Sequence, residues 1–338
     1  MSSGYAALRK TEKYMKVPKK FSNEAPRLAI VLPCFNEFDS ITYAVTELGM
    51  VVDQLIADKL VADNSYLFFV DDGSTDCTWS EIERFHQKGS QVKGLKLAKN
   101  FGHQAALLAG LNSVNSQCDA AISLDVDLQQ DPLAIRDFIK AFCSGADVVL
   151  GVRRDRNTDS WFKRLTATFF YKLMKVMGVN TVPNHADNRL LSQRALKALD
   201  LFSEPNIFLR AICLQLGFRT SQVMFDVKER QYGRTKYSLA KMLGLALTGV
   251  TSFSIVPLRL VAIVGMGLFV LSLGMSAYVF WQSLVIGGTV PGWASTTLPI
   301  YFIGGVQLLC LGVVGEYVGQ IYATVKSRPR WISEQLLD

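Results

Sequence analysis

The residues most suited to chemistry lie near position 125, where Asp125 and Asp127 are spaced i, i+2 and Gln129 follows them. Along a β-strand, residues with this spacing point to the same side, so the two carboxylates are predicted to aim at one point. Two carboxylates and an amide oxygen suit a hard divalent cation, Mg²⁺ or Mn²⁺. A strand that ends in a solvated acidic turn would show the same pattern. The apolar residues of the segment would take the opposite face and anchor it in a core: Leu124, Val126 and Leu128.

A second acidic pair, Asp71 and Asp72, ends an apolar run and precedes Gly73. Carboxylates at a strand tip can accept hydrogen bonds from a base N–H or from ribose hydroxyls. The sequence contains neither of the Gly-rich phosphate loops GxxxxGK[ST] and GxGxxG. We therefore expect a nucleotide held by its base and ribose, with a metal ion carrying the diphosphate. Ordinary turn chemistry would also explain Asp-Gly-Ser.

Strand and helix signals alternate through residues 27–152. Strands are expected at 28–32, 66–70, 92–97, 120–124 and 147–152, and helices at 39–56, 76–87, 104–114 and 132–142. This alternation predicts an α/β fold with a parallel sheet covered on both faces. Ligands of such sheets bind beyond the carboxyl ends of the strands. Both acidic pairs fall there, together with Asn36, Glu37 and Asn100. Further on, a loop around Pro183 and a strand at 222–227 are expected.

The C-terminal part of the chain is apolar enough to enter a membrane. Hydrophobic residues make up 49% of the 338 residues, and no charged residue occurs from 260 to 281. A second stretch, 298–315, is broken only by Gln307 and reaches the length of a bilayer crossing if it continues to about Tyr322. The predicted transmembrane helices are 258–286 and 298–322. A buried core helix is the alternative for each.

Charges around these helices predict their orientation. The connection 287–297 carries no Lys or Arg, whereas Arg259 lies at the start of the first helix and Lys326, Arg328 and Arg330 follow the second. By the positive-inside tendency, both ends of this hairpin then lie in the cytoplasm.

The rest of the chain divides into four predicted segments. They are a basic flexible tail (1–26), a cytoplasmic catalytic domain (27–236), an amphipathic membrane-surface segment (237–257) and a cytoplasmic tail (323–338). The basic tail could touch anionic lipid or be solvated and functionless. The segment 237–257 could instead be a packed internal helix.

Three segments, Leu32–Glu37, Val70–Asp76 and Leu124–Pro132, resemble the ordered signature of the inverting GT-A glycosyltransferases. Lys99–Gly102 and Arg230–Tyr237 narrow the resemblance to the polyprenyl-phosphate glycosyltransferases, which include dolichyl-phosphate mannose synthase. Among these, the chain is most similar to the membrane-anchored, GtrB-like bactoprenol glucosyltransferases. The resemblance implies a GT-A (Rossmann-like) nucleotide-sugar domain with a C-terminal two-helix transmembrane anchor.

The resemblance also assigns roles to residues by position. The nucleoside would be held by Pro33, Asn36, Glu37, Asp71 and Asp72. The metal site would consist of Asp125, Asp127 and Gln129, and the catalytic residues would be Asp127 and Arg230. This chain departs from the family pattern twice. An extra residue separates Gln129 from Pro132, and the usual Asp-Phe-Arg reads Asp187-Asn188-Arg189, so the roles of Asp187 and Arg189 stay open.

A lipid phosphate acceptor agrees with the absence of a motif for a general base. The second pKa of a phosphate monoester is about 6, so the acceptor is largely a dianion at cytoplasmic pH and can attack the anomeric carbon unaided. Such a site needs cations for the acceptor phosphate and a metal ion for the departing diphosphate. The candidate cations are Arg153, Arg164, Arg230, Arg234 and Lys236. A solvated or lipid-touching face is the alternative for the last three.

The predicted reaction is therefore transfer of a hexose to undecaprenyl phosphate, with inversion, at the bacterial inner membrane. The product would serve O-antigen or cell-envelope glycan modification. UDP-glucose is the favoured donor; UDP-N-acetylglucosamine, UDP-galactose, UDP-4-formamido-arabinose and GDP-mannose stay open. Predicted partners are the bilayer, a homo-oligomer, a flippase and a second membrane glycosyltransferase, but no nucleic acid.

Two other classes of protein are weighed against this enzyme. A processive polysaccharide synthase would need more membrane spans and the motif Gln-x-x-Arg-Trp, which is missing. A membrane-anchored nucleotide-sugar sensor, or a scaffold for a flippase, would bind a nucleotide sugar without turnover.

Overall fold

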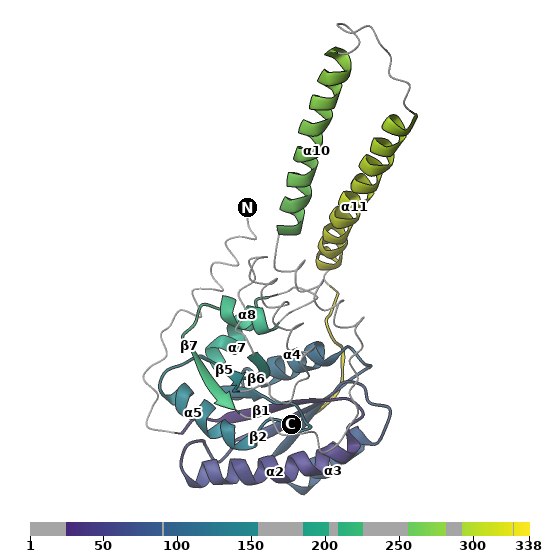
Figure 1. The fold of residues 1–338 in the computed structure, drawn as a ribbon. Coiled ribbons are helices and arrows are strands. Elements are labelled where there is room, and N and C mark those ends of the chain that lie inside the picture. The colour runs from purple at the N-terminus through teal and green to yellow at the C-terminus, as the bar shows by residue number, and fades with distance from the viewer. Residues whose placement is uncertain are drawn as a thin grey trace, which may run out of the picture. The chain divides into compact units, whose positions relative to one another are not determined.

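The computed structural model describes residues 25–89, 91–154, 185–202, 209–225, 256–281, 293–326 and 328–338. These residues divide into two compact units (Figure 1). One is an α/β domain, to which residues 329–338 at the C-terminus also belong, and the other contains a pair of long helices. The predicted tail 1–26 and the predicted membrane-surface segment 237–257 lie almost entirely outside the described residues.

The α/β domain is built on one eight-stranded sheet in the order β7-β5-β6-β4-β1-β2-β3-β8. Its strands are β1 (Leu28–Cys34), β2 (Tyr66–Asp71), β3 (Val92–Leu97), β4 (Ala120–Ser123), β5 (Val148–Arg153), β6 (His185–Ser192), β7 (Thr220–Phe225) and β8 (Ser333–Leu337). The central strands β4, β1, β2 and β3 run parallel, as their alternation with helices predicts. The carboxyl ends of these strands therefore meet at one edge of the sheet.

The five strands predicted within 27–152 run parallel, but the sheet as a whole is mixed because it contains two antiparallel strands that were not predicted. β6 pairs antiparallel with both β4 and β5, and β8 pairs antiparallel with β3. Neither strand has the apolar run that marks a buried strand in a sequence. β6 begins His-Ala-Asp-Asn-Arg, and β8 reads Ser-Glu-Gln-Leu-Leu with its side chains largely exposed.

The helices of this domain are α2 (Phe38–Ala57), α3 (Thr78–Lys88), α4 (His103–Val114), the short 3₁₀ helix η1 (Pro132–Ala134), α5 (Ile135–Cys143), α7 (Gln193–Leu199) and α8 (Leu209–Gln215). α4 lies on the face of the sheet opposite α2 and α3 (Figure 1). It approaches the strands closely, because a Cβ at Gly110 would lie 2.5 Å from Val31 Cγ1 and 2.6 Å from Val70 Cγ2. Only glycine allows this packing without a shift of the strands.

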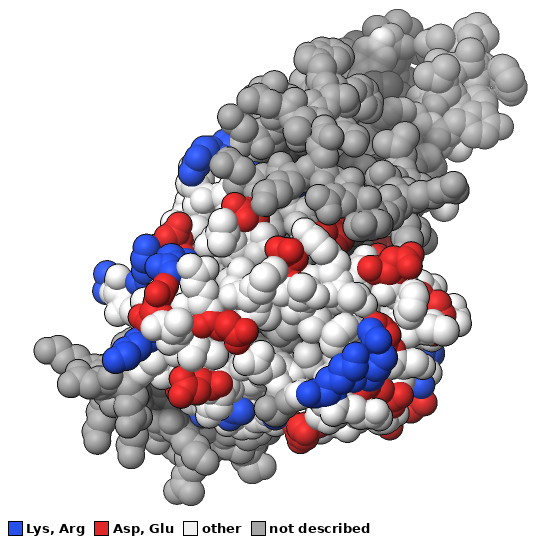
Figure 2. Space-filling model, turned by 90° about the horizontal axis from the view of Figure 1, so that it is seen from below, with Lys and Arg blue, Asp and Glu red and all other residues white. Residues whose placement is uncertain are grey.

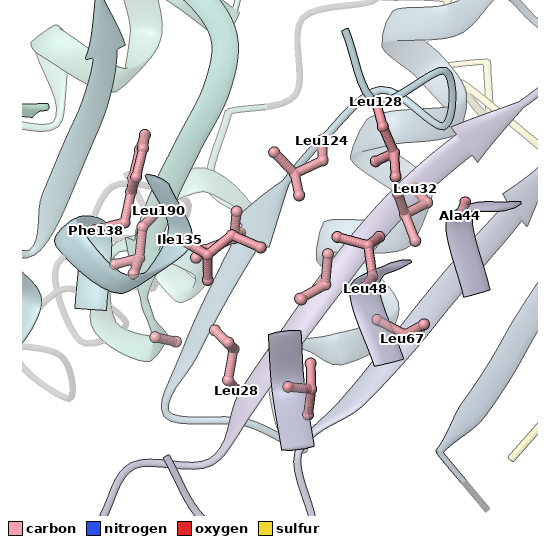
Figure 3. Close-up of a cluster of buried hydrophobic side chains, with 14 of the residues drawn as sticks. Leu28, Leu32, Ala44, Leu48, Leu67, Leu124, Leu128, Ile135, Phe138 and Leu190 are labelled. Atoms are coloured by element: carbon pink, nitrogen blue, oxygen red, sulfur yellow. The ribbon is translucent and has the colours of Figure 1, made fainter. Parts of the chain in front are cut away.

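The largest cluster of buried apolar side chains fills the space between the sheet and α2, with η1 and α5 beside it (Figure 3). Alternate residues of β1, such as Leu28 and Leu32, face this cluster because side chains of a strand alternate between its two faces. Leu124 and Leu128, from the segment after β4, point into the same cluster. The apolar side of the acidic motif is thus anchored in the core, as predicted.

In the second unit, α10 (Val256–Trp281) and α11 (Trp293–Val325) contact each other. Within α11, Phe302–Val325 is a segment of 24 residues with a mean hydropathy of 1.5, and none of it is buried. It is the one segment of the described residues that is long and apolar enough, by this measure, to cross a membrane. Within the described residues, α10 covers 256–281, which includes most of the predicted span 258–286, and α11 includes the whole predicted span 298–322.

Charged side chains of both signs are spread over the face of the protein shown in Figure 2. Lys and Arg lie in separate groups among Asp and Glu, around an uncharged area. The described part of this face therefore presents no continuous basic surface of the kind that follows a polyanion backbone.

Candidate active site

Two loops at the carboxyl edge of the sheet are fastened together through Asp72. The residue follows β2, and its carboxylate accepts hydrogen bonds from the amides of Phe101 (2.7 Å) and Gly102 (2.9 Å), which lie in the loop after β3. Burial raises the pKa of Asp72 above its ordinary range, although these two hydrogen bonds act to lower it. Asp72 was predicted to hold a nucleoside; both of its carboxylate oxygens are used here to position the loop at 99–102.

Gly73 makes the same junction tight. Its φ of +67° lies in the left-handed region, which favours glycine. A Cβ at this position would lie 2.4 Å from the carbonyl carbon of Lys99, so the two loops are in backbone contact. A side chain at position 73 would push the loop at 99–102 away from the end of β2.

Asp71 has one carboxylate oxygen without a hydrogen-bond partner among the described residues. Oδ1 accepts a hydrogen bond from the Ser74 amide at 3.2 Å, whereas Oδ2 is buried and has no hydrogen-bond partner among the described residues. Burial raises the pKa of this carboxyl, partly offset by the hydrogen bonds from Ser74. An unpaired buried oxygen is costly, and a base N–H would satisfy it.

Asn36 and Glu37 support the loop that follows Asp71. Asn36 has a φ of +52°, its amide donates to Ser74 Oγ (2.9 Å), and its Oδ1 accepts from the Thr75 amide (2.9 Å). The Glu37 amide donates to Thr78 Oγ1 at 3.0 Å. Pro33, the fifth residue predicted to hold the nucleoside, is buried within β1 opposite Val70. These three residues shape the site from the side of β1.

The Asp-x-Asp segment forms a turn, so the predicted strand geometry is wrong there. β4 ends at Ser123, the Leu128 amide donates to the Asp125 carbonyl (3.2 Å), and Leu128 has a φ of +44°. A left-handed conformation at a leucine is rare, and such backbone strain is concentrated at functional sites. Asp127 Oδ1 accepts from the Gln129 amide at 3.3 Å.

Gln130 holds one of the two aspartates. Its side-chain amide donates to Asp125 Oδ2 at 3.1 Å, while its own Oε1 is buried without a hydrogen-bond partner among the described residues. Gln129 and Gln130 are thus both candidates for the amide oxygen beside the carboxylates. The extra residue in this motif explains why the sequence pointed to Gln129 alone.

Several charged groups surround Asp125. His103 Nε2 lies 3.7 Å from Asp125 Oδ1. Burial raises the pKa of Asp125; His103 acts to lower it, and the carboxylates of Asp187 and Asp127 raise it further. Carboxylates that repel each other attract a divalent cation, because the cation removes the repulsion. Among the described residues, no group of three or more His, Cys, Asp and Glu side chains could hold a metal ion, so a cation at Asp125 and Asp127 would need its other ligands from water or a diphosphate.

Asp187 and two arginines complete this side of the site. Arg189 Nη2 donates to Asp187 Oδ1 at 2.9 Å, and Arg210 donates to both oxygens, at 3.2 Å from Nε and 2.8 Å from Nη2. Burial acts to raise the pKa of Asp187, but Arg210 and Arg189 more than offset this and hold it well below the ordinary range. Arg189 is completely buried beside β4, where its partner in the sheet is Ser123.

The predicted cations are only partly within the described residues. Arg153 ends β5 and is half-buried. Arg164, Arg230, Arg234 and Lys236 lie outside the described residues. The sequence analysis missed His103, Gln130 and Arg210. His103 could have been found from its position at the start of the helix after β3, but nothing near Arg210 in the sequence indicates that it reaches Asp187.

Comparison with known proteins identifies the family of the chain. Residues 29–200 match the model of the family "Glycosyl transferase family 2", and residues 256–321 match the "GtrB C-terminal hairpin". The chain belongs to glycosyl transferase family 2, and it is a glycosyltransferase with a GT-A, Rossmann-like α/β fold.

Its relatives extend over nearly the whole chain. It is 47% identical to the uncharacterized glycosyltransferase YkoT of Bacillus subtilis, over 90% of each protein. It is 36% identical to the SfII prophage-derived bactoprenol glucosyl transferase of Shigella flexneri, over 90% of this chain and 97% of that protein. It is 34% identical to the prophage bactoprenol glucosyl transferase homolog of Escherichia coli, over 92% and 99%.

Proposed function

We propose that this glycosyltransferase transfers a hexose from a nucleotide sugar to a polyprenyl phosphate at a membrane, with inversion at the anomeric carbon. The proposed donor is UDP-glucose and the proposed transferred sugar is glucose. One relative that is similar over most of the chain is named a bactoprenol glucosyl transferase, and another is named a homolog of one. The observation that carries the proposal is the occurrence, in one chain, of a family 2 domain and a hairpin of two long apolar helices.

The nucleoside end of the donor is assigned to the carboxyl ends of β1 and β2. Asp71 Oδ2 would accept a hydrogen bond from the N–H of the base, because it is buried and has no hydrogen-bond partner among the described residues. Asp72, Gly73 and Asn36 hold the two surrounding loops in place. Binding of the base would therefore supply a hydrogen bond to a buried oxygen that is costly to leave unpaired.

The diphosphate is assigned to the turn after β4. Asp125 and Asp127 would hold Mg²⁺ or Mn²⁺, which supplies positive charge against the charge that develops on the departing diphosphate. Gln130 restrains Asp125 through its side-chain amide. Asp187 is a third carboxylate on this side of the site, and its ion pairs with Arg189 and Arg210 balance its negative charge.

The acceptor needs no general base from the protein. A phosphate monoester is largely a dianion at neutral pH, so one of its oxygens attacks the anomeric carbon directly. The bond from that carbon to the nucleoside diphosphate breaks on the opposite face, which inverts the configuration. Arg153 is a candidate for the acceptor phosphate within the described residues, and Arg164, Arg230, Arg234 and Lys236 are candidates beyond them. Arginine suits this role because its planar fork binds phosphate through two hydrogen bonds.

The hairpin is proposed as a two-helix membrane anchor with both ends in the cytoplasm. The charges that flank α10 and α11 support this orientation through the positive-inside tendency. A polyprenyl phosphate presents its phosphate at the membrane surface. An enzyme anchored in the same membrane therefore meets this acceptor by diffusion within the plane of the membrane. A multi-pass protein of the bacterial inner membrane is the resulting proposal.

The test is a transfer assay with purified full-length protein in lipid nanodiscs. Undecaprenyl phosphate, Mg²⁺ or Mn²⁺ and one candidate nucleotide sugar at a time are supplied, and the lipid product is identified by mass spectrometry. We expect a monohexosyl phosphate lipid from UDP-glucose, and a β-linked product from an α-linked donor. Product from another donor alone would replace the sugar assignment and keep the reaction class.

The control in this assay is dodecanol in place of undecaprenyl phosphate, because an alcohol lacks the anionic nucleophile. Equal transfer to both acceptors would contradict direct attack by a phosphate. Tight binding of UDP without product from any donor would contradict the proposed reaction and favour a nucleotide-sugar sensor.

A further inference from the structure

The C-terminal strand β8 returns to the α/β domain and covers the edge of its sheet. Residues 326–332 separate the end of α11 from β8, which pairs antiparallel with β3 from Gly94 opposite Leu337 to Leu97 opposite Ser333. Without β8, β3 would be the open edge of the sheet. Open edges expose unpaired amides and carbonyls, and proteins cover or blunt them.

Specific side-chain contacts fasten β8 to this edge. Gln335 donates from Nε2 to Glu83 Oε1 (2.9 Å) and accepts at Oε1 from Trp79 Nε1 (3.2 Å), so it is held by two residues of α3. Glu334 pairs with Lys96 of β3 at 3.0 Å. At the far end of the strand, Asp338 lies 3.7 Å from Lys93. The contacts fix the register of β8, whose own sequence has little β-strand character.

The pairing reaches past β3 into the loop that holds Asp72. The Ala98 amide donates to the Ile332 carbonyl at 2.9 Å, one residue beyond the end of β3. The same loop continues through Lys99, which contacts Gly73, to the Phe101 and Gly102 amides that bind Asp72. This loop is therefore held on one side by the nucleotide site and on the other by the chain leaving the helical hairpin.

We infer that the C-terminal segment 332–338 is a positioning element for the donor site, because it fixes the loop at 98–102 against Asp72 and Gly73. The inference rests on the proposed nucleotide site at Asp71 and Asp72. The segment touches no substrate itself. Its loss frees one side of the loop and so weakens the preorganisation on which donor affinity depends.

β8 also provides a second covalent link between the α/β domain and the helical hairpin. Because β8 follows α11 after only residues 326–332, the domain that binds the donor is tied to the hairpin by two connections, 226–255 and 326–332. Residues 326–332 lead directly into the pairing with the loop at 98–102. The segment that follows the proposed anchor is therefore also the one that positions the proposed donor site.

The experiment compares two truncations of the full-length protein in nanodiscs. The variant lacking 332–338 removes the hydrogen bond to Ala98, whereas the variant lacking 337–338 removes only the far end of β8. UDP and GDP binding are measured by calorimetry, and the KM values for donor and acceptor are measured with the thermal midpoint of unfolding. We expect removal of 332–338 to weaken nucleotide binding and raise the donor KM by at least fivefold, with the acceptor KM unchanged. Removal of 337–338 is expected to change these values less than twofold.

Two substitutions test the same point should the longer truncation not fold. Glu334→Lys places like charge opposite Lys96 near the loop, and Asp338→Lys makes the same charge change at the far end near Lys93. Added positive charge alone would strengthen binding of a diphosphate. Weaker UDP binding in Glu334→Lys, together with wild-type UDP binding in Asp338→Lys, would therefore support positioning of the loop at 98–102 by β8.

The outcomes separate this inference from the proposed function. A folded variant lacking 332–338, or Glu334→Lys, with wild-type nucleotide affinity and donor KM would overturn the inference while the proposed function stands. A lower thermal midpoint with unchanged donor KM would also overturn it, because it shows a purely structural strand. A wild-type protein that binds neither UDP nor GDP would overturn the proposed function and the inference with it.

Discussion

The amide of Phe101 donates a hydrogen bond to Oδ1 of Asp72 over 2.7 Å, and this contact joins the loop after β3 to the loop after β2. The two strands are parallel neighbours, so both loops emerge at the same edge of the sheet. Within the acidic motif, Asp72 therefore positions two loops, whereas one carboxylate oxygen of Asp71 has no hydrogen-bond partner among the described residues.

Asp72→Asn tests this division. An asparagine keeps one acceptor oxygen but turns an NH₂ donor toward one of the two backbone amides, which leaves a partly buried donor unsatisfied. We expect the free energy of unfolding to fall by about 1–3 kcal/mol and UDP binding to weaken, measured by denaturation and calorimetry. Asp63→Asn, at an exposed position, is the matched control. Wild-type stability for Asp72→Asn would contradict a structural role.

The pH dependence of nucleotide binding tests Asp71. Burial raises its pKa, so ionisation is disfavoured in the folded protein. Its contribution to stability is therefore present below the ordinary pKa of aspartate and is lost as the pH rises through the raised pKa. A base N–H on Oδ2 favours the ionised form. UDP affinity should thus fall as the pH is lowered through that raised pKa, at a higher pH than for an ordinary aspartate.

The measurement is a series of UDP titrations from neutral into mildly acidic pH. Asp71→Asn cannot ionise, so its weaker binding should lose this step. A wild-type profile that is flat through the same range, or the same step in Asp71→Asn, would show that Asp71 does not face the base.

Asp127→Asn tests the assignment of the metal site. Removing one carboxylate charge from the turn after β4 should lower kcat by on the order of 100-fold or more, because a bound cation contributes several kcal/mol to stabilising the departing charge. Metal binding can be followed independently by Mn²⁺ electron paramagnetic resonance in the presence of UDP. The control is Asp137→Asn on α5, an exposed carboxylate. Near-normal turnover and Mn²⁺ binding in Asp127→Asn would move the metal site elsewhere.

Labelling of single cysteines tests the orientation of the hairpin. The loop 287–297 is expected on the outer side of the membrane and β8 on the inner side. Thr289→Cys should therefore react with an impermeant maleimide in intact spheroplasts, and Glu334→Cys should react only after lysis. The unsubstituted protein measures the background of the native cysteines. Labelling of both positions before lysis, or of neither, would contradict a two-span hairpin with cytoplasmic ends.

The sequence allowed the central part of the fold to be predicted because its signals are local. β1 and β2 are short, buried and almost entirely apolar, and β2 ends at Asp71, whereas β3 alternates Lys with buried residues. Parallel topology then brings Asp71 and Asp125 to one edge without further information. β6 and β8 could not be predicted this way, because their strand character comes from pairing with β4, β5 and β3 and not from their own composition.

The candidate site, too, could be predicted only where its signals are local in the sequence. The predicted pair Asp125 and Asp127 is found at the carboxyl edge, but in a turn, because a left-handed Leu128 cannot be read from a leucine in a sequence. Gln130, which the sequence did not single out, donates to Asp125, and the prediction of Gln129 as a metal ligand stays a prediction. Arg210 is 23 residues from Asp187 in the chain, and only the packing of α8 brings the two together.

Arg210→Gln tests the ion pair with Asp187. Arg210 and Arg189 hold the pKa of Asp187 below its ordinary range, so their contribution to stability is present above the ordinary pKa and is lost as the pH falls through the lowered one. The free energy of unfolding of Arg210→Gln should therefore be lower than that of wild type by about 1–3 kcal/mol at neutral pH. The difference should narrow as the pH falls below the ordinary range of aspartate. Lys140→Gln, which breaks an exposed pair with Asp137, should change stability little at any pH. A constant difference between Arg210→Gln and wild type across the pH series would show that Arg210 acts through packing and not through the charge of Asp187.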